Sequence, residues 1–442
     1  MMDNSGLDRR QFLKTAATVA VGAHVAASSA RAQDGQKLRM GLVGCGGQGT
    51  VLLTNALRVP EIEWVATCDI VEEKAKGAAE RIEEGGNVPT FTNYQDMLES
   101  VEMDAVAIAV PLHWHAPIAI AAFETGLHVF CEKCMAYTVD ECKDMIRAQM
   151  SANKILQIGH HLRYHPLYWH AKRTFVEGGL LGQITSVYAQ WNRNNSWRRP
   201  VAIEGDFTEW GYPDADHLVN WRLYQEYSGG LMTELASHQI DVVTWMLDRT
   251  PTAVQGMGGV DFYDDGRTVP DNVHVSFQYP GGVTFDYISG TTNAFSIFGN
   301  QCHEVIKGTE GTLVMTHLNP GPTDSMGWFF PEEGTQREIW MDMAHKTDIG
   351  GHEAILLDAT VTEGPPLAGQ PISTLIDEEG HLQKMTYQVE FEEFVISCRE
   401  MKLPSCDGMI GMKSAADAIM ANQAIATGET LPFPEDMYEV TM

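Results

Sequence analysis

Basic residues are scarce in this chain of 442 residues. It holds 30 Lys and Arg against 59 Asp and Glu, which gives a formal net charge of −29 at pH 7. Surfaces that bind nucleic acid are built from clustered Lys and Arg, so this balance argues against a nucleic-acid partner. The excess of acid does not identify a substrate, because a charged surface of this kind mainly keeps a protein soluble.

The chain also lacks a disulfide pattern, a second CxxC motif and, beyond residue 32, long apolar segments. The eight cysteines lie mainly inside apolar runs, and their spacing does not indicate a disulfide framework. Cys131 and Cys134 form a CxxC without a second one, so we predict neither a redox site nor a zinc site there. Beyond residue 32, no segment has the length and apolarity to span a bilayer, so the mature chain is predicted to lack a membrane anchor.

The first 32 residues have the pattern of an export address. The segment Asp8–Lys14, with the sequence DRRQFLK, resembles the twin-arginine signal. An Ala-rich, weakly apolar segment follows over Thr15–Ala30, and a small-x-small cleavage site ends at Ala32. We therefore predict a twin-arginine signal peptide over residues 1–32 and a periplasmic or otherwise exported mature protein. The alternative is an amphipathic N-terminus of a cytosolic protein.

A glycine-rich turn follows the first apolar run of the mature chain. The run Leu38–Val43 has the character of a strand, and the pattern GxGxxG then precedes apolar residues at helical spacing. In that context the glycines allow a tight turn and bring a pyrophosphate close to a helix N-terminus. Asp69 lies 69 − 49 = 20 residues beyond the last glycine, where a carboxylate accepts the ribose hydroxyls of NAD. The alternative is a glycine turn in another kind of α/β protein. The predicted NAD-binding residues are Gly44, Gly46, Gly47, Gln48, Gly49 and Asp69.

Strand-like and helical runs alternate from residue 37 to 159, and a different texture follows. The alternation predicts an α/β fold whose first domain, residues 37–159, contains a doubly wound parallel sheet. Residues 160–442 are predicted to form a second α/β domain, because short turns join several strands between Thr252 and Val314, as in a mainly antiparallel sheet. The predicted strands are Leu38–Val43, Ile62–Cys68, Ala105–Val110, His128–Cys131, Ile155–Ile158, Ile184–Trp191, Ala253–Val260, Val273–Tyr279, Val283–Ser289 and Glu304–Lys307.

Two clusters of polar residues follow strands of the predicted parallel sheet. Pro111, His113 and His115 come after the third run, and Glu132 and Lys133 come after the fourth. Because ligands bind at the carboxyl ends of such strands, we expect these residues at the cofactor. A lysine buried beside a carboxylate can exchange a proton more readily than an exposed one. The alternative is an ion pair on an exposed loop.

Another cluster lies on a predicted helix, Leu231–Leu247. Glu234, His238 and Asp241 are spaced i, i+4 and i+7, which places them on one helix face. A carboxylate one turn from a histidine can raise its basicity and fix its tautomer. Taken alone, the spacing also fits a solvated helix face.

In combination these motifs resemble the Gfo/Idh/MocA family, named for glucose–fructose oxidoreductase and inositol dehydrogenase. The resemblance covers nearly all of the mature chain and extends to the leader of the family's exported members. It implies an N-terminal Rossmann domain and a C-terminal α/β domain with a large, open, mainly antiparallel sheet. In this family the open face of that sheet commonly mediates the contacts in dimers or tetramers. The other matching motifs are His113–His115, Glu132-Lys133, Arg163–Pro166, Gly179–Ile184, Gly229-Gly230, Ser237–Asp241 and Gly308–Thr312.

The resemblance also implies roles for single residues. Lys133 would contact the reacting hydroxyl, His238 would be the general acid/base and Glu234 would support His238, while the substrate C–H gives a hydride to NAD. Two positions depart from the family pattern, because Cys134 replaces the proline of Glu-Lys-Pro and Glu234 replaces the usual aspartate. Further residues expected at the nicotinamide or the substrate are Arg163, Tyr164, His165, Trp197 and Arg198.

Aromatic and polar residues are mixed in the segment Trp191–Pro200. Its indoles, amides and guanidinium groups suit stacking on sugars and recognition of their hydroxyls, and the alternative is an ordinary surface loop. His160, His161 and His165 lie close together but lack an obvious carboxylate partner, so we prefer packing or substrate contacts to a metal site.

Three functions are compatible with these motifs. The first is an NAD-dependent oxidoreductase that acts on a hydroxyl of a sugar, sugar derivative or polyol, with a tightly bound cofactor that is recycled in place. The second is an NAD-dependent glycoside hydrolase that works by oxidation, elimination and re-reduction, as some relatives of the family do. The third is a nucleotide-bound sugar sensor, which the presence of both Lys133 and His238 disfavours. We expect NAD rather than NADP, because no arginine follows Asp69 where a 2′-phosphate would lie.

Overall fold

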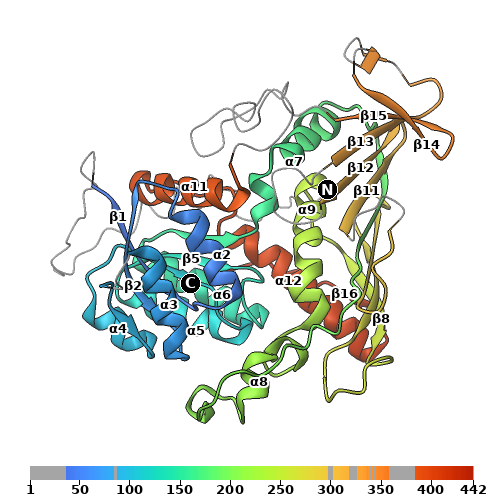
Figure 1. Ribbon diagram of the computed structural model, residues 1–442. Helices are drawn as coiled ribbons and strands as arrows, with labels where there is room; N and C mark the ends of the chain where they lie inside the picture. The colour runs from blue at the N-terminus through green and yellow to red at the C-terminus, as the bar shows by residue number, and fades with distance from the viewer. Residues whose placement is uncertain are drawn as a thin grey trace.

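The computed structural model describes residues 36–83, 87–296, 302–317, 326–335, 337–338, 341–342, 344–357 and 384–441. The predicted signal peptide, residues 1–32, lies outside these ranges. Within them the chain forms two β-sheets, with helices packed between and around them (Figure 1).

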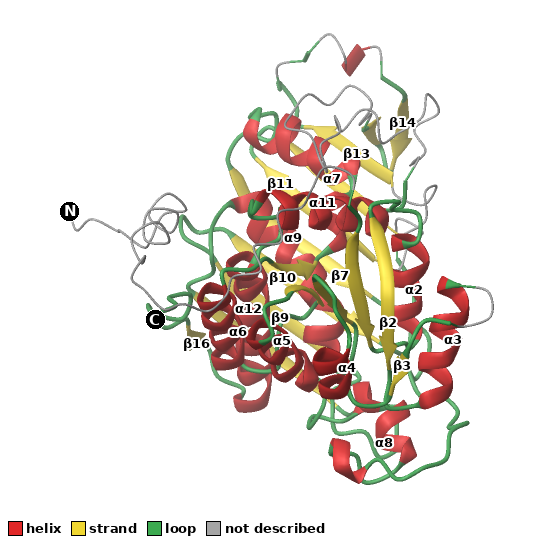
Figure 2. Ribbon diagram, turned by 90° about the vertical axis from the view of Figure 1, so that its left-hand side faces the viewer, coloured by secondary structure: helices red, strands yellow, loops and turns green. Residues whose placement is uncertain are grey.

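The first sheet contains six parallel strands in the order β3-β2-β1-β4-β5-β6, which confirms the predicted doubly wound parallel sheet. Its strands are apolar along their length because helices α2, α3 and α11 cover one face and α4, α5 and α6 cover the other (Figure 2). The strands are β1 (Leu38–Val43), β2 (Ile62–Cys68), β3 (Thr90–Phe91), β4 (Ala105–Ile108), β5 (His128–Glu132) and β6 (Leu156–Gly159). The helices are α2 (Gly47–Ala56), α3 (Glu72–Ile82), α4 (Tyr94–Ser100), α5 (His115–Glu124) and α6 (Val139–Ala152).

The second sheet contains ten strands in the order β14-β15-β13-β12-β11-β7-β10-β9-β8-β16. Its pairs are antiparallel except for the parallel pair of β7 and β10, which confirms a mainly antiparallel sheet. The strands are β7 (Ile184–Trp191), β8 (Ala253–Gly259), β9 (Asn272–Gln278), β10 (Thr284–Gly290), β11 (Cys302–Gly308), β12 (Gly311–His317), β13 (Met326–Pro331), β14 (Lys346–Ile349), β15 (His352–Leu356) and β16 (Leu431–Pro432).

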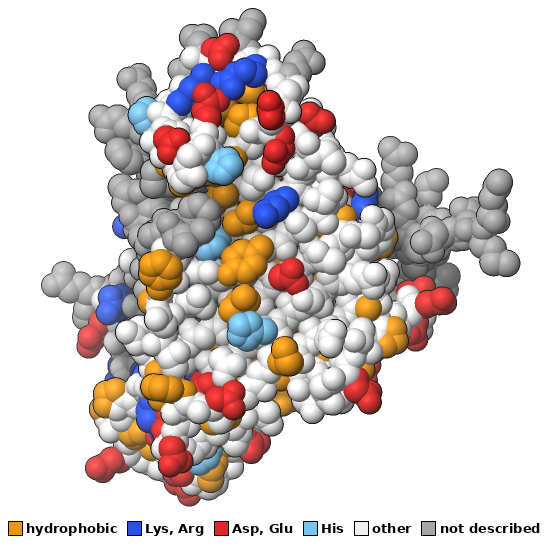
Figure 3. Space-filling model, turned by 90° about the vertical axis from the view of Figure 1, so that its right-hand side faces the viewer, with side chains coloured by type: hydrophobic (Ala, Val, Ile, Leu, Met, Phe, Trp, Pro, Cys, Tyr) orange, Lys and Arg blue, Asp and Glu red, His pale blue; other side chains and the backbone are white. Residues whose placement is uncertain are grey.

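The two faces of this second sheet differ. Along β9, buried and exposed side chains alternate, because one face packs on helices α9 (Ser237–Leu247) and α12 (Gly408–Thr427). The opposite face carries exposed side chains, among them Met257, which is 72% exposed. Figure 3 shows this side of the molecule, where apolar side chains are scattered among polar ones.

Two C-terminal helices tie the sheets together. Helix α11 (Thr386–Glu400) returns to the first sheet, where Phe391 stacks on Phe130 of β5 at 4.6 Å between ring centroids. Helix α12 lies between the second sheet and the parallel sheet, and its Gly411 meets Ile158 of β6 (Figure 1). Burial of apolar surface at both helices fixes the relative position of the sheets.

Two helical segments contain π-helical turns. In the first, α7 (Pro166–His170) is followed by a π turn over Ala171–Glu177. The predicted helix Leu231–Leu247 begins with a π turn over Met232–Ala236 before α9. Such turns re-aim the side chains that follow them and often occur at functional sites.

All eight cysteines are buried free thiols. Among the described residues, none of the helices combines the length and the apolarity that a bilayer crossing requires.

Candidate active site

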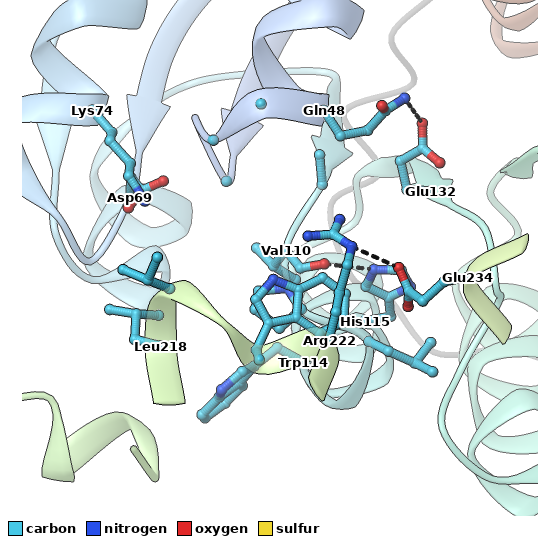
Figure 4. Close-up of a pocket in the computed structure, with 18 of the residues that line it drawn as sticks. Gln48, Asp69, Lys74, Val110, Trp114, His115, Glu132, Leu218, Arg222 and Glu234 are labelled. Carbon is cyan, nitrogen blue, oxygen red and sulfur yellow. Dashed lines mark hydrogen bonds and ion pairs between the residues drawn. The ribbon is translucent and has the colours of Figure 1, made fainter. Parts of the chain in front are cut away.

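A cavity of about 690 Å³ opens between the carboxyl ends of the parallel strands and the second sheet (Figure 4). Loops after β1, β2, β4 and β5 form one wall, and residues from β7, the π turn and the start of α9 form the other. The predicted site residues that line it are Gly44, Gly46, Gly47, Gln48, Asp69, Pro111, His115, Glu132, Lys133, Trp197, Glu234 and His238.

The glycine turn, Gly44–Gly49, has the shape that a diphosphate requires. Gly44 has φ +91°, and a Cβ on it would lie 2.4 Å from the backbone oxygen of Ala109. Gly49 faces away from the cavity, where a Cβ would meet the Gly44 oxygen at 1.8 Å. In contrast, a Cβ on Gly46 or Gly47 would meet nothing within 4 Å. The open side of the turn and the N-terminus of α2 therefore fit the pyrophosphate of a dinucleotide.

Asp69 lies at the far end of the cavity, with Lys74 beside it (Figure 4). Its two carboxylate oxygens accept hydrogen bonds from the backbone N–H groups of Cys45 at 2.8 Å and Val71 at 2.9 Å. Burial raises the pKa of Asp69, and the nearby charge of Lys74 opposes this shift. The bonds fix the carboxylate where it can accept a hydrogen bond from ribose hydroxyls.

The loops after β4 and β5 are joined by His115. Its buried ring lies within hydrogen-bond distance of the backbone oxygens of Val110 at 3.0 Å and Cys134 at 2.8 Å. A neutral ring donates to only one of these oxygens, and burial lowers the pKa of His115. The histidine therefore holds the loop that carries Lys133 against the loop at the end of β4.

Glu132 and Lys133 point toward different sides of the site. The buried Glu132 accepts a hydrogen bond from the Gln48 side chain at 2.7 Å, which ties it to the glycine turn (Figure 4). Lys133 reaches across the cavity and donates from Nζ to the backbone oxygen of Glu234 at 3.0 Å. This contact brings the lysine of the first domain to the π turn of the second.

Glu234 and His238 both line the cavity, but the Glu234 carboxylate is engaged by other groups. Arg222 donates to it from Nε at 2.9 Å, and Ser228 donates at 3.3 Å (Figure 4). The His238 ring packs edge-on against that of His161 at 5.0 Å between centroids. The π turn Met232–Ala236 contains Glu234 and interrupts the regular helical spacing predicted for Glu234 and His238.

Asp241, the third residue of that pattern, belongs to a buried ion pair behind the cavity. Arg163 donates to its two oxygens at 2.7 and 2.9 Å. Next to Arg163 in the chain, Tyr164 donates to Glu393 at 2.8 Å. Both residues are buried by these contacts and do not line the cavity. The predicted site residues outside the cavity lining are Gly49, His113, Arg163, Tyr164, His165 and Arg198.

Two predicted histidines have packing contacts. His165 accepts a hydrogen bond from the backbone N–H of Leu167 and thereby caps α7. The His113 ring packs against Tyr212 at 5.6 Å and Tyr227 at 5.1 Å. Among the described residues, no group of three or more His, Cys, Asp or Glu side chains is arranged to hold a metal ion.

Residues 199–227, here called the overlying segment, cross from the second sheet to the first domain and include α8 (Ala215–Val219). Arg198 anchors the start of the segment through ion pairs with Asp216 at 2.8 Å and Asp265 at 3.3 Å. Farther along, Trp210 packs edge-on against Trp114 at 5.7 Å. The segment thus closes the cavity beside Asp69, and Trp210 is part of the lining there.

Several cavity residues were not among the predicted site residues. Trp191, Arg193 and Arg199 lie in the mixed aromatic and polar segment, which was the one signal for them in the sequence. Arg222 and Tyr387 belong to none of the motifs, and only the packing of the overlying segment and of α11 brings them to the cavity.

Comparisons with known proteins agree with this geometry. The family model for oxidoreductases with an NAD-binding Rossmann fold matches residues 38–160, and that for the Gfo/Idh/MocA C-terminal domain matches residues 169–314. A glycosyl hydrolase family 109 protein from Stenotrophomonas maltophilia is 30% identical over 368 residues, which cover 78% of this chain and 76% of that protein. A levoglucosan dehydrogenase from Pseudarthrobacter phenanthrenivorans is 26% identical over 308 residues, which cover 64% and 74%.

A solved structure shows the same fold. The complex of levoglucosan dehydrogenase with NADH and levoglucosan has a TM-score of 0.68 and 21% identity, and the match covers 90% of this chain and 100% of that one. Together with the two family matches, these findings identify the chain as a member of the Gfo/Idh/MocA family of NAD-binding oxidoreductases.

Proposed function

We propose that this chain oxidises a hydroxyl-bearing carbon of a sugar, sugar derivative or polyol. The observation that carries the proposal is the meeting of Lys133 and His238, from different domains, in the cavity that also holds the glycine turn. NAD, when bound, supplies the hydride acceptor. Lys133 binds the oxygen of the reacting hydroxyl, and His238 takes up its proton. The naming of one relative as a levoglucosan dehydrogenase supports a carbohydrate substrate.

Glu234 contributes to this arrangement in two ways. Its backbone oxygen holds the Lys133 ammonium in the cavity, and its carboxylate holds the Arg222 guanidinium. This supports a positioning role for Glu234 rather than proton transfer by its carboxylate. Positioned proton transfer of the kind proposed for Lys133 and His238 typically contributes about 10²–10⁴-fold to a rate.

A second candidate is an NAD-dependent glycoside hydrolase. It is favoured by the 30% identity to a protein named as a family 109 glycosyl hydrolase. In that cycle a ring hydroxyl is oxidised, the proton on the adjacent carbon is removed, the aglycone leaves, water adds to the resulting double bond and the ketone is reduced again. The elimination needs a further proton acceptor, and His161 lies in the cavity beside His238.

We also propose where the protein acts, how it keeps its cofactor and how its copies assemble. The pattern of Asp8–Lys14 supports export through the twin-arginine route, which carries folded proteins. We propose that the cofactor travels inside the folded chain, binds tightly and is recycled in place. We also propose that the open face of the ten-stranded sheet joins copies of this chain into a dimer or tetramer (Figure 3).

One experiment separates the two candidate functions. Purified protein is mixed with nitrophenyl glycosides and with pairs of free sugars, and NADH absorbance, nitrophenol release and the sugar products are followed together. Net NADH formation, or oxidation of one sugar with reduction of another, supports the oxidoreductase, and nitrophenol release without net NADH supports the hydrolase. A sugar sensor gives none of these signals, and that outcome would overturn both candidates.

A further inference from the structure

The substrate end of the cavity is cationic, although the whole chain has a net charge of −29. Two carboxylates lie at this end, and both are engaged: Gln48 donates to Glu132, and Arg222 donates to Glu234. The cations that line it are Lys133, Arg193, Arg199 and Arg222.

Arg193 is held rigidly and lacks a counter-ion among the described residues. Its guanidinium lies over the rings of Trp191 at 5.3 Å and Trp197 at 5.0 Å. Its Nε is buried and makes no hydrogen bond within the part of the chain that the structure describes. Burial lowers the pKa of Arg193, which is the sign of a desolvated charge. The planar edge of the group is therefore oriented by two indoles, and no acceptor for it lies among the described residues.

The buried arginines Arg163 and Arg267 have carboxylate partners, whereas the half-buried Arg193 has none among the described residues. Arg163 is paired with Asp241 at 2.7 Å, and Arg267 is paired with Asp265 at 2.7 Å. A buried charge without a partner costs much more than a paired one. Arg199 is exposed and also forms no ion pair among the described residues, and partial burial and the neighbouring charge of Arg222 both lower its pKa. The excess charge thus calls for an anion from outside the chain.

The diphosphate of the cofactor does not account for this charge. The glycine turn and the N-terminus of α2 fit that group, and they belong to the first domain. Arg193 instead follows β7 of the second sheet, where the ring of Trp191 lies 5.6 Å from that of His238. The Arg193 guanidinium therefore lies on the side of the cavity that holds His238.

We infer that the substrate is an anionic carbohydrate whose carboxylate is bound by Arg193, with Arg199 and Arg222 beside it. A uronic acid or a uronoside has this chemistry. The flat fork of a guanidinium matches the two oxygens of a carboxylate, and Trp191 and Trp197 offer apolar faces for a sugar ring. This inference names the substrate class of the proposed function and rests on it.

The first test compares neutral and anionic sugars on the holoenzyme. Calorimetry with NAD present measures the binding affinity of glucuronate and of glucose, and of galacturonate and of galactose. Glucose 6-phosphate and glucose 6-sulfate are measured as further anions. At least one uronate is expected to bind roughly 10- to 100-fold more tightly than its neutral parent sugar. Added salt should reduce this difference in affinity. If each uronate binds no more tightly than its neutral parent sugar, the inference is overturned. If the sugar phosphate or sulfate binds more tightly than the uronates, the assignment of a carboxylate as the bound anion is overturned.

Substitutions locate the charge that is responsible. Arg193→Gln is expected to reduce the ratio of uronate to neutral-sugar affinity roughly tenfold or more, and Arg193→Lys to reduce it less. The matched control is Arg58→Gln, an exposed arginine of the first domain, which should leave the ratio unchanged. Melting curves and NAD content verify that each variant is folded. A folded Arg193→Gln protein with the full preference for uronate contradicts the inference.

The same data distinguish this inference from the proposed function. If neutral sugars are oxidised and uronates neither bind nor react, the inference fails and the oxidoreductase remains. If uronates bind through Arg193 but no anionic or neutral sugar yields NADH, an oxidised or reduced sugar product or a released aglycone, the anion site remains and the proposed function fails.

Discussion

Lys133 and His238 reach one cavity from different sheets, so the chemistry depends on side chains that the two domains contribute separately. We expect Lys133→Ala and His238→Ala to reduce turnover by about 10²–10⁴-fold, the usual contribution of positioned proton transfer. Both should keep their NAD, because neither side chain belongs to the glycine turn. Glu234→Gln should lose less, since its backbone oxygen still holds Lys133.

Turnover and the amount of NAD released on denaturation, measured on the same preparations, test this prediction. The exposed Lys402 provides a control, and Lys402→Ala should behave as the unmodified chain does. Near-normal turnover of Lys133→Ala on the true substrate would show that the role given to Lys133 is wrong.

Cofactor choice is a second question at the scale of single residues. The 2′-phosphate of NADP would meet the Asp69 carboxylate, so NAD should bind roughly tenfold or more tightly, a difference of about 1.4 kcal/mol. Glu72 and Glu73 are exposed and do not line the cavity, whereas Lys74 does. Lys74→Ala should therefore weaken NADP binding more than NAD binding. Calorimetric titrations that give equal or tighter binding of NADP to the unaltered chain contradict the prediction.

Strand β11 carries a fully buried acid, Glu304, which accepts a hydrogen bond from Tyr168 at 2.9 Å. Burial raises the pKa of Glu304 to about 8 from a usual value of 4.5. Between these two pH values the folded chain binds more protons than the unfolded chain, so stability falls as the pH rises. The slope contributed by such a group is at most about 1.4 kcal/mol per pH unit.

Glu304→Gln removes this titration and keeps an oxygen that accepts the Tyr168 hydrogen bond. We expect the variant to match the unaltered protein near pH 4 and to melt at a higher temperature at pH 9. Some pH dependence will remain, because burial also raises the pKa of Asp417 to about 7. Melting curves of both proteins at about pH 4 and pH 9 test this prediction. If the melting temperature of Glu304→Gln changes between the two pH values as much as that of the unaltered protein, Glu304 does not titrate as inferred.

The overlying segment should control the release of the cofactor. Trp210 packs edge-on against Trp114 at 5.7 Å and lies 6.4 Å from Tyr94, and aromatic pairs contribute about 0.5–1.5 kcal/mol each. Trp210→Ala should therefore release bound NADH on the order of tenfold faster, as followed by fluorescence after dilution. Phe262→Ala, at a side chain that is 70% exposed, serves as the control. An unchanged release rate would leave the segment without this role.

At the scale of elements, the sequence predicted what depends on local pattern. The strands Leu38–Val43, Ile62–Cys68 and Ile184–Trp191 have the predicted bounds, because short, largely apolar runs rich in β-branched and aromatic residues specify strands. The π turn at Met232–Ala236 was missed, because a shift in backbone hydrogen bonding follows from packing rather than from periodicity.

The part of the site that depends on local sequence pattern was also predictable, and the part that depends on long-range packing was not. Glycine spacing and the ends of parallel strands located the half of the cavity that the first domain forms, including Lys133. The expectation for Arg163 did not anticipate its buried pair with Asp241, which depends on how two distant segments pack. Arg222 and Tyr387 come from elements that carry no motif, so only the three-dimensional fold brings them to the cavity.

For the whole molecule, the proposed export and the cofactor site make a joint prediction. The twin-arginine pattern at Arg9 and Arg10 occurs on a chain that binds a dinucleotide. A compartment outside the cytoplasm should hold little free NAD, so a cofactor that dissociated there would be lost. Retention requires tight binding, and a nanomolar constant corresponds to about −12 kcal/mol. The overlying segment, which closes the cavity beside Asp69, is the part of the fold suited to such retention.

A cofactor that stays bound must return to its starting redox state within each cycle. The overall reaction should then be redox-neutral, through reduction of a second sugar or through oxidation, elimination and re-reduction of one substrate. We therefore expect protein purified from the periplasm without added nucleotide to release close to one NAD or NADH per chain when it is denatured. The Trp210→Ala variant, prepared in the same way, should release less. An empty site, with activity that depends on added NAD and yields free NADH in proportion to product, would exclude this cycle.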